Sequence, residues 1–167
     1  MEKKILSELK WGIVIILVDF NIGSFNLLPD FLGYLLFGLA VKEWKKEQPD
    51  LGRLKPFLWI LGIESMIQWV FPFYNGLVQL VVTAVSCYTV YVLLGAAAGQ
   101  LEVRQPDHAG GLERLRIGVI ALQVVYFFAG GYGNGTVLTL LAVAMILLVI
   151  GILLNLHSVE ASERVQE

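Results

Sequence analysis

The chain has 167 residues, of which 57% are apolar and only 16% are charged, and its mean hydropathy is +0.72. A soluble domain normally carries about 25% charged residues, so this composition argues against an ordinary soluble protein. The formal net charge of −2 indicates nothing about partners by itself. The single cysteine, Cys87, excludes an internal disulfide and a cysteine metal cluster.

Two long stretches contain no aspartate, glutamate, lysine or arginine, namely residues 65–101 and 117–159. A membrane-spanning helix needs about 20 mostly apolar residues, so each stretch can hold one or two spans. We therefore predict an all-α polytopic membrane protein, a bundle of six transmembrane helices that forms one domain over residues 1–167. The predicted spans are approximately residues 5–22, 28–41, 56–71, 76–98, 115–129 and 137–156.

Helix-breaking residues separate these spans in chain order. Pro29 suits the first turn of the second helix, where its missing N–H costs nothing. Pro72 and Gly76 bracket a tight turn after the third helix. Residues 105–111 read as a polar loop after the fourth helix, and the glycine-rich residues 129–135 separate the fifth helix from the sixth.

The basic residues all fall on one side of this predicted topology. The three loops on the other side, residues 21–27, 73–75 and 130–136, contain none. The positive-inside rule then places both termini in the cytoplasm. The twelve basic residues are Lys3, Lys4, Lys10, Lys42, Lys45, Lys46, Arg53, Lys55, Arg104, Arg114, Arg116 and Arg164.

Three acidic residues, Asp19, Asp30 and Glu64, lie inside the predicted spans or at their ends. A carboxylate in hydrocarbon is costly, so such residues usually face a protein interior or a wet cavity. Asp30 and Glu64 can also be explained by structural roles, whereas Asp19 cannot be explained so easily. Asp30 in a first helical turn is favoured by the helix dipole, and Glu64 together with Gln68 can simply form hydrogen bonds to a neighbouring helix. Asp19 lies toward a helix C-terminus, where the dipole disfavours a carboxylate.

The second predicted helix is short for a span. From Pro29 to Lys42 it covers about 20 Å of a hydrocarbon core that is about 30 Å thick. The connection before it should therefore dip below the outer surface, where the polar side chains of Asn21, Ser24 and Asn26 would supply the compensating hydrogen bonds. We expect an outward-facing acidic pocket there. Neutral ligands would come from Asn21, Asn26, Gln68 and Gln79, with Gln79 on a stripe that also contains Thr83 and Ser86.

Other kinds of site are disfavoured. His108 and His157 have no cysteine, aspartate or glutamate at ligand spacing, so we expect no metal site and no cofactor. No Ser/His/Asp set can be assembled on one side of the membrane, and we expect no enzyme, although a hydrolase using Asp19 and Asp30 is conceivable. The charged loop between the second and third spans mixes both signs and does not indicate nucleic-acid binding. Gly95 and Gly99 match a small-residue motif for helix packing.

Residues 19–34 carry a motif of the form Asn-x-Leu-Pro-Asp-Phe-x-Gly-Tyr, from Asn26 to Tyr34. The motif resembles that of uncharacterised small integral membrane proteins of Gram-positive, Firmicute-type bacteria. This resemblance implies a multi-pass protein of the bacterial cytoplasmic membrane and carries over no activity. The six-span plan also resembles, in architecture alone, the substrate-binding subunits of energy-coupling-factor vitamin transporters.

Two functional hypotheses follow. In the first, the acidic pocket binds or transports a cation, a proton or a small polar solute, with Asp19, Asp30 and Glu64 as its charged groups. In the second, the chain is a non-catalytic accessory, immunity or sensing subunit of a larger membrane complex, with another membrane protein or a second copy as partner. Both hypotheses have the lipid bilayer as the surrounding medium.

Overall fold

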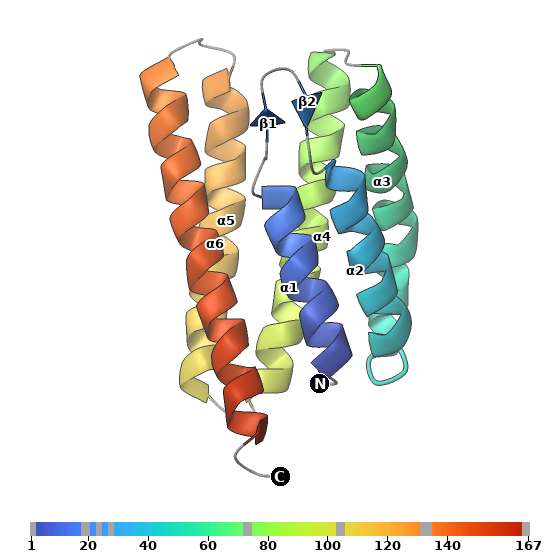
Figure 1. Cartoon of the computed structure of the whole chain (residues 1–167), viewed down its shortest axis with the longest axis vertical. Coiled ribbons are helices and arrows are strands. Elements are labelled where there is room, and N and C mark those ends of the chain that lie inside the picture. Colours follow the sequence, from blue (N-terminus) through green and yellow to red (C-terminus); the bar gives the residue numbers. More distant parts are fainter. Residues whose placement is uncertain are drawn as a thin grey trace. The chain divides into compact units, whose positions relative to one another are not determined.

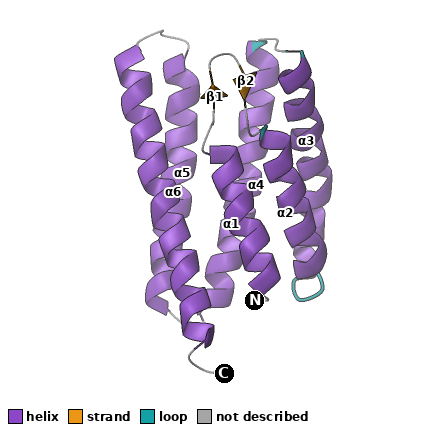
Figure 2. Cartoon of the chain, in the orientation of Figure 1, coloured by secondary structure: helices purple, strands orange, loops and turns teal. Residues whose placement is uncertain are grey.

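A computed structural model describes residues 3–17, 21–22, 25–26, 29–71, 75–102, 106–130 and 135–164. Apart from two short strands, the regular structure of these residues is helical, which confirms the all-α class and the six predicted helices (Figures 1 and 2). The contacts divide the chain into two compact units, Met1–Ser86 and Cys87–Glu167. The elements are α1 (Lys3–Leu17), β1 (Asn21–Ile22), β2 (Phe25–Asn26), α2 (Asp30–Trp44), the 3-10 helix η1 (Pro49–Leu54), α3 (Lys55–Val70), α4 (Gly76–Glu102), α5 (Pro106–Gly130) and α6 (Gly135–Arg164).

The connection between α1 and α2 differs from the expectation. The first helix ends at Leu17 rather than at residue 22, and the chain then forms an antiparallel pair of strands (Figure 1). Asn21 pairs with Asn26, and Ile22 pairs with Phe25. A strand pair satisfies part of its own backbone hydrogen bonding, so less depends on the asparagine side chains than the sequence suggested.

Two glycines let α1 and α2 approach each other closely within the first unit. A Cβ atom added to Gly33 would lie 2.9 Å from the Gly12 carbonyl oxygen, and one added to Gly12 would lie 3.1 Å from the Gly33 carbonyl oxygen. The side chains of Phe37 and Ile16 close over the two glycines, each within 2.6 Å of such a Cβ position. Because both positions lack a side chain, the two backbones pack directly against each other.

A compact hairpin joins α2 to α3. The Gln48 N–H donates to the Trp44 carbonyl oxygen at 2.9 Å, and the Leu51 N–H donates to the Gln48 oxygen at 3.1 Å. Trp44 and Leu54 are fully buried beneath this turn. The 3-10 helix η1 therefore folds back onto the end of α2, and Lys55 opens α3 at the same end of the unit.

The helices α4 and α5 begin at two different kinds of residue, an asparagine that caps the helix and a proline in the first turn. Asn75 caps α4, because its side-chain oxygen accepts hydrogen bonds from the N–H groups of Leu77 at 3.0 Å and Val78 at 3.2 Å. By contrast, α5 begins at Pro106, so most of the predicted polar loop is helical. Proline is favoured in the first helical turn, which explains the earlier start.

In the second unit, α5 packs against α6. Gly151 of α6 gives room to Leu115, whose Cδ2 atom lies 3.1 Å from the position of an added Cβ. Nearer the start of α5, His108 Nδ1 lies 3.3 Å from Asn155 Oδ1, and the Asn155 amide donates to the Gly151 carbonyl oxygen at 2.9 Å. The pair is thus fixed by both apolar and polar contacts.

Two of the helices are long and apolar enough to cross a membrane, by length and composition. They are Gly76–Glu102, which is α4, and Gly135–His157 within α6. Only 22% of the apolar stretch of α4 and 11% of that of α6 is buried inside the protein. The coarse prediction of membrane association therefore has support from the described part of the chain.

Candidate functional site

A polar cluster lies inside the first unit, centred on the side chain of Tyr34. Tyr34 belongs to α2 and is buried, as is Ser86 on α4, and the two side chains share a hydrogen bond. The carboxylates of Asp30 and Glu64 both lie close enough to act electrostatically on the Tyr34 hydroxyl. Polar side chains from α2, α3 and α4 thus act on one phenol, and we call Tyr34, Ser86, Asp30 and Glu64 the Tyr34 cluster.

The packing of α3 against α2 brings Glu64 to this cluster. Gly62 lies beside Tyr34, since a Cβ added there would be 3.7 Å from the Tyr34 Cβ. Farther along the same helices, the rings of Phe31 and Trp69 meet edge to face with their centroids 6.0 Å apart. These two contacts set the register of α3, which places Glu64 level with the cluster.

The side chain of Glu64 is held by its own helix. The Gln68 amide donates a hydrogen bond to the Glu64 carboxylate, and both residues are half-buried. Residues four apart share one face of a helix, so the predicted pairing of these two is present. An amide donor beside a carboxylate leaves the remaining oxygen lone pairs available to a proton or a cation.

Asp30 combines two roles. It is the first residue of α2, directly after Pro29, whose backbone is extended with φ −66° and ψ 136°. In that position a carboxylate is stabilised by the helix dipole, as the structural interpretation of the sequence predicted. The same carboxylate acts on the Tyr34 hydroxyl, one turn along the helix. The structural role and membership of the cluster are therefore compatible.

No direct contact with the Tyr34 cluster is described for the remaining predicted ligands. Gln79 is half-buried on α4, and it lies two turns from Ser86 on the same side of that helix. Asn21 and Asn26 face each other as backbone partners across the strand pair. Asp19 lies outside the residues that the structure describes, so its relation to the Tyr34 cluster stays a prediction.

The sequence does not single out the two residues at the centre of the cluster. Ser86 belongs to a polar stripe on the fourth predicted helix, and Tyr34 is the last residue of the Asn-x-Leu-Pro-Asp-Phe-x-Gly-Tyr motif. The signal that could have found Tyr34 is its spacing from Asp30, since residues four apart share a helix face. Nothing in the sequence alone pairs Tyr34 with Ser86, because that pairing depends on how separate helices pack.

The chemistry open to this cluster is that of protons and hard cations. Carboxylate, amide and hydroxyl oxygens are ligands of hard cations, and a carboxylate beside a phenol can also exchange a proton. Within the described ranges, no group of three or more histidine, cysteine, aspartate or glutamate side chains has the geometry to hold a metal ion. No protein-family model, no curated protein and no solved structure matches this chain.

Proposed function

We propose that the protein is a small multi-pass protein of the bacterial cytoplasmic membrane that binds or transports a proton, a cation or a small polar solute at the Tyr34 cluster. In this proposal all six helices cross the membrane and both termini are cytoplasmic. The observation that carries the functional part is that the carboxylates of Asp30 and Glu64 both act electrostatically on the buried Tyr34 hydroxyl, which is hydrogen-bonded to Ser86.

The apolar surface supports the membrane part of the proposal. Besides α4 and α6, the shorter helix α3 also exposes large apolar side chains over one broad face. Soluble proteins rarely expose apolar patches of this extent, whereas a lipid bilayer covers them at no cost. The exposed apolar residues of α3 are Trp59, Ile60, Ile63, Met66, Ile67, Trp69 and Val70.

The positions of the charged groups support the functional part. Glu64 and Asp30 lie on helices that are otherwise mostly apolar, and ionisable residues kept in such helices usually serve transport or proton relay. The predicted outer loops contain no basic residue that could neutralise these acids. A cation or a proton from outside is therefore the natural counter-charge.

The test is a flux measurement in proteoliposomes that contain the full chain and a pH-sensitive dye. A proton gradient and gradients of sodium and of potassium are imposed in separate experiments. We expect Glu64→Gln to lower the flux of the transported ion by at least about tenfold, because the variant removes the charge and keeps the shape of the side chain. The matched control is Glu102→Gln, which removes an exposed carboxylate at the end of α4.

Three outcomes distinguish the functional hypotheses. Loss of flux in Glu64→Gln but not in Glu102→Gln supports transport through the Tyr34 cluster. Equal flux in the wild type and both variants contradicts a role for Glu64. No flux above that of empty liposomes contradicts transport by the isolated chain, and co-purification of a stoichiometric partner from native membranes would then favour the accessory-subunit hypothesis.

A further inference from the structure

Ser65 lies at the centre of the inner face of α3. On the same face, one and two turns before it, Leu61 and Leu58 are 0% and 5% exposed. The two contacts of α3 with α2 described above, at Gly62 and at Trp69, come one turn before and one turn after Ser65. The side chain of Ser65 therefore points toward the helices that pack against α3.

The hydroxyl of Ser65 is buried and has no hydrogen-bond partner among the described residues. A serine inside a helix can satisfy its hydroxyl by donating to the carbonyl oxygen four residues earlier, here that of Leu61, but this bond is not formed. A buried polar atom without a partner costs free energy, so each such atom calls for an explanation. The lone pairs of this oxygen are available to a ligand.

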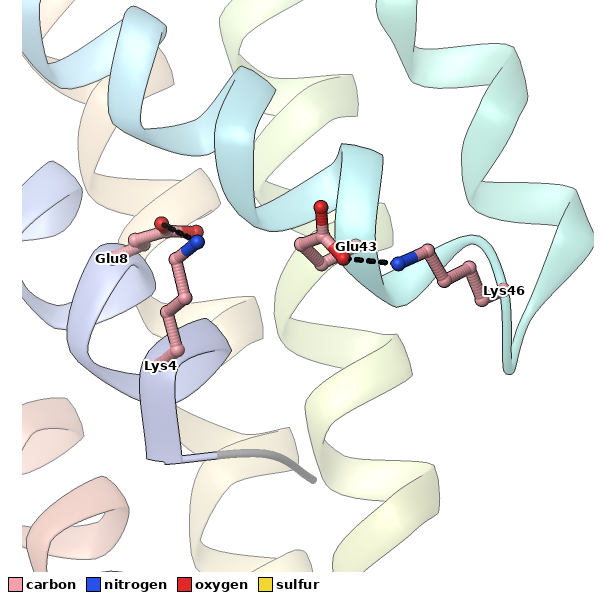
Figure 3. Close-up of polar contacts among 4 residues, drawn as sticks. All are labelled: Lys4, Glu8, Glu43 and Lys46. Carbon is pink, nitrogen blue, oxygen red and sulfur yellow. Dashed lines mark hydrogen bonds and ion pairs between the residues drawn. The ribbon is translucent and has the colours of Figure 1, made fainter.

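The carboxylate next to Ser65 has no positive partner within the described ranges. Elsewhere in the first unit, Lys4 Nζ lies 4.0 Å from Glu8 Oε1, and Glu43 pairs with Lys46 (Figure 3). By contrast, Glu64 forms no ion pair with a described lysine or arginine, and its hydrogen bond comes from a neutral amide. A cation bound from solution would balance this charge.

One turn of α3 thus carries three oxygen groups, which are the carboxylate of Glu64, the hydroxyl of Ser65 and the amide oxygen of Gln68. Gln68 donates to Glu64 through its amide nitrogen, so its oxygen is still an acceptor. A proton needs only one of these groups, whereas a hard cation needs several oxygens. We propose that Glu64, Ser65 and Gln68 bind one sodium ion. The inference rests on the proposed function, since Glu64 belongs to the Tyr34 cluster, and it names the ion that this cluster takes.

Charge and size favour a small monovalent ion. Glu64 supplies one negative charge on this turn, and among the described residues no three acidic, histidine or cysteine side chains are placed to hold a metal ion, which argues against a divalent one. The space between α3 and α2 is narrow, because a Cβ added to Gly62 would lie 3.7 Å from the Tyr34 Cβ. Water and the hydroxyls of the Tyr34 cluster can complete the oxygen shell.

The first experiment measures equilibrium binding of radioactive sodium to the purified full chain in detergent. We expect saturable binding by the wild type and an affinity lowered about tenfold in Ser65→Ala, because this variant removes one oxygen ligand. The matched control is Ser7→Ala, which removes the same hydroxyl from an exposed position of α1 and should leave the affinity unchanged. Equal affinities of wild type and Ser65→Ala, or equal losses in the two variants, would overturn the role of Ser65. Absence of saturable binding by the wild type would overturn the sodium site.

Thermal unfolding separates ion binding from a purely structural role and shows that the variant folds. In choline chloride, Ser65→Ala should melt at the temperature of the wild type or above it, because it removes a buried hydroxyl that has no partner. In sodium chloride the wild type should gain stability from the bound ion, and the variant should gain much less. An equal gain in the two proteins, or a lower melting temperature of the variant in choline chloride, would contradict the inference.

Measurements with potassium and with protons distinguish this inference from the proposed function. Equal affinities for sodium and potassium would overturn the assignment to sodium. Proton flux that depends on Glu64, without saturable sodium binding, would overturn the sodium site and leave the proposed function standing. Sodium binding that depends on Ser65, without any flux, would support the site and contradict only the transport part of the proposed function.

Discussion

Tyr34 of α2 and Ser86 of α4 share a hydrogen bond in the interior of the first unit. Replacing Tyr34 by Phe or Ser86 by Ala removes this bond, and we expect each change to cost about 1 kcal/mol of the free energy of unfolding. Thermal unfolding in detergent micelles of both single variants and the double variant gives the coupling between them. A coupling near zero, with the two losses simply additive, would show that the two side chains do not interact.

The close approach of α1 and α2 makes a second prediction. Gly33→Ala would place a Cβ 2.9 Å from the Gly12 carbonyl oxygen, which forces the helices apart and should lower the free energy of unfolding by about 1–3 kcal/mol. Gly38→Ala on the same helix is the control, because no atom lies within 4 Å of its Cβ position. We expect the control to be neutral or stabilising, since alanine favours a helix over glycine. Equal melting temperatures for the two variants would refute the close packing.

Arg116 makes the third prediction, in the second unit. Its guanidinium lies 4.0 Å from the centre of the Tyr91 ring, donates to the Tyr91 carbonyl oxygen at 3.4 Å and pairs with Glu113. The side chain is only 12% exposed, so Arg116→Lys should cost about 1–2 kcal/mol through loss of the stacked planar group.

The control for this change is Arg53→Lys, whose side chain is 80% exposed and should tolerate lysine within about 0.5 kcal/mol. Chemical unfolding of the two variants under the same conditions gives the comparison. A neutral Arg116→Lys would show that the planar guanidinium is not needed there.

Lys55 makes a prediction about pH. The hydrogen bond and the charge of Lys45 lower the pKa of Lys55 from its usual value of 10.5. Between the lowered pKa and 10.5 the unfolded chain binds more protons at this position than the folded chain, so the contribution of Lys55 to stability rises with pH over that interval. NMR titration of isotopically methylated lysines measures the value directly. Lys45→Gln should raise the pKa of Lys55, and an unchanged value would contradict the influence of Lys45 on Lys55.

Much of the fold could be predicted because apolar runs and helix breakers are local signals. Pro29 and the glycines near residue 130 separate helices where expected, whereas the start of α5 was placed too late. There the polar and glycine-containing residues after Pro106 resemble a loop, but packing of His108 and Gly111 against Asn155 keeps them helical. Tertiary contacts of this kind are not visible in the local sequence.

The glycine pair on α4 shows the same limit. Gly95 and Gly99 predicted a helix-packing motif, but only Gly95 has a neighbour, since a Cβ there would lie 3.3 Å from Cζ of Arg116. Among the described residues, no atom beyond the helix's own backbone lies within 4 Å of the Cβ position at Gly99. Whether both glycines pack against another helix stays a prediction.

Contacts of the candidate site within one helix could be predicted from the sequence, but contacts between helices could not. Helical spacing within α3 was enough to pair Glu64 with Gln68. The Tyr34 cluster instead depends on where separate helices bring residues that are distant in the chain. Those relationships follow from packing, which the sequence specifies only as a whole.

The central claim, that the Tyr34 cluster is reachable by water from outside the cell while the exposed apolar face of α3 lies in lipid, has a direct test. Cys87 is the only cysteine, so Cys87→Ala provides a background for single cysteines at Gln68 and at its neighbour Ile67, which is 43% exposed. Both variants are treated in intact cells with a membrane-impermeant thiol reagent. The account predicts rapid modification of Gln68→Cys and little of Ile67→Cys, and equal rates at the two positions would contradict it.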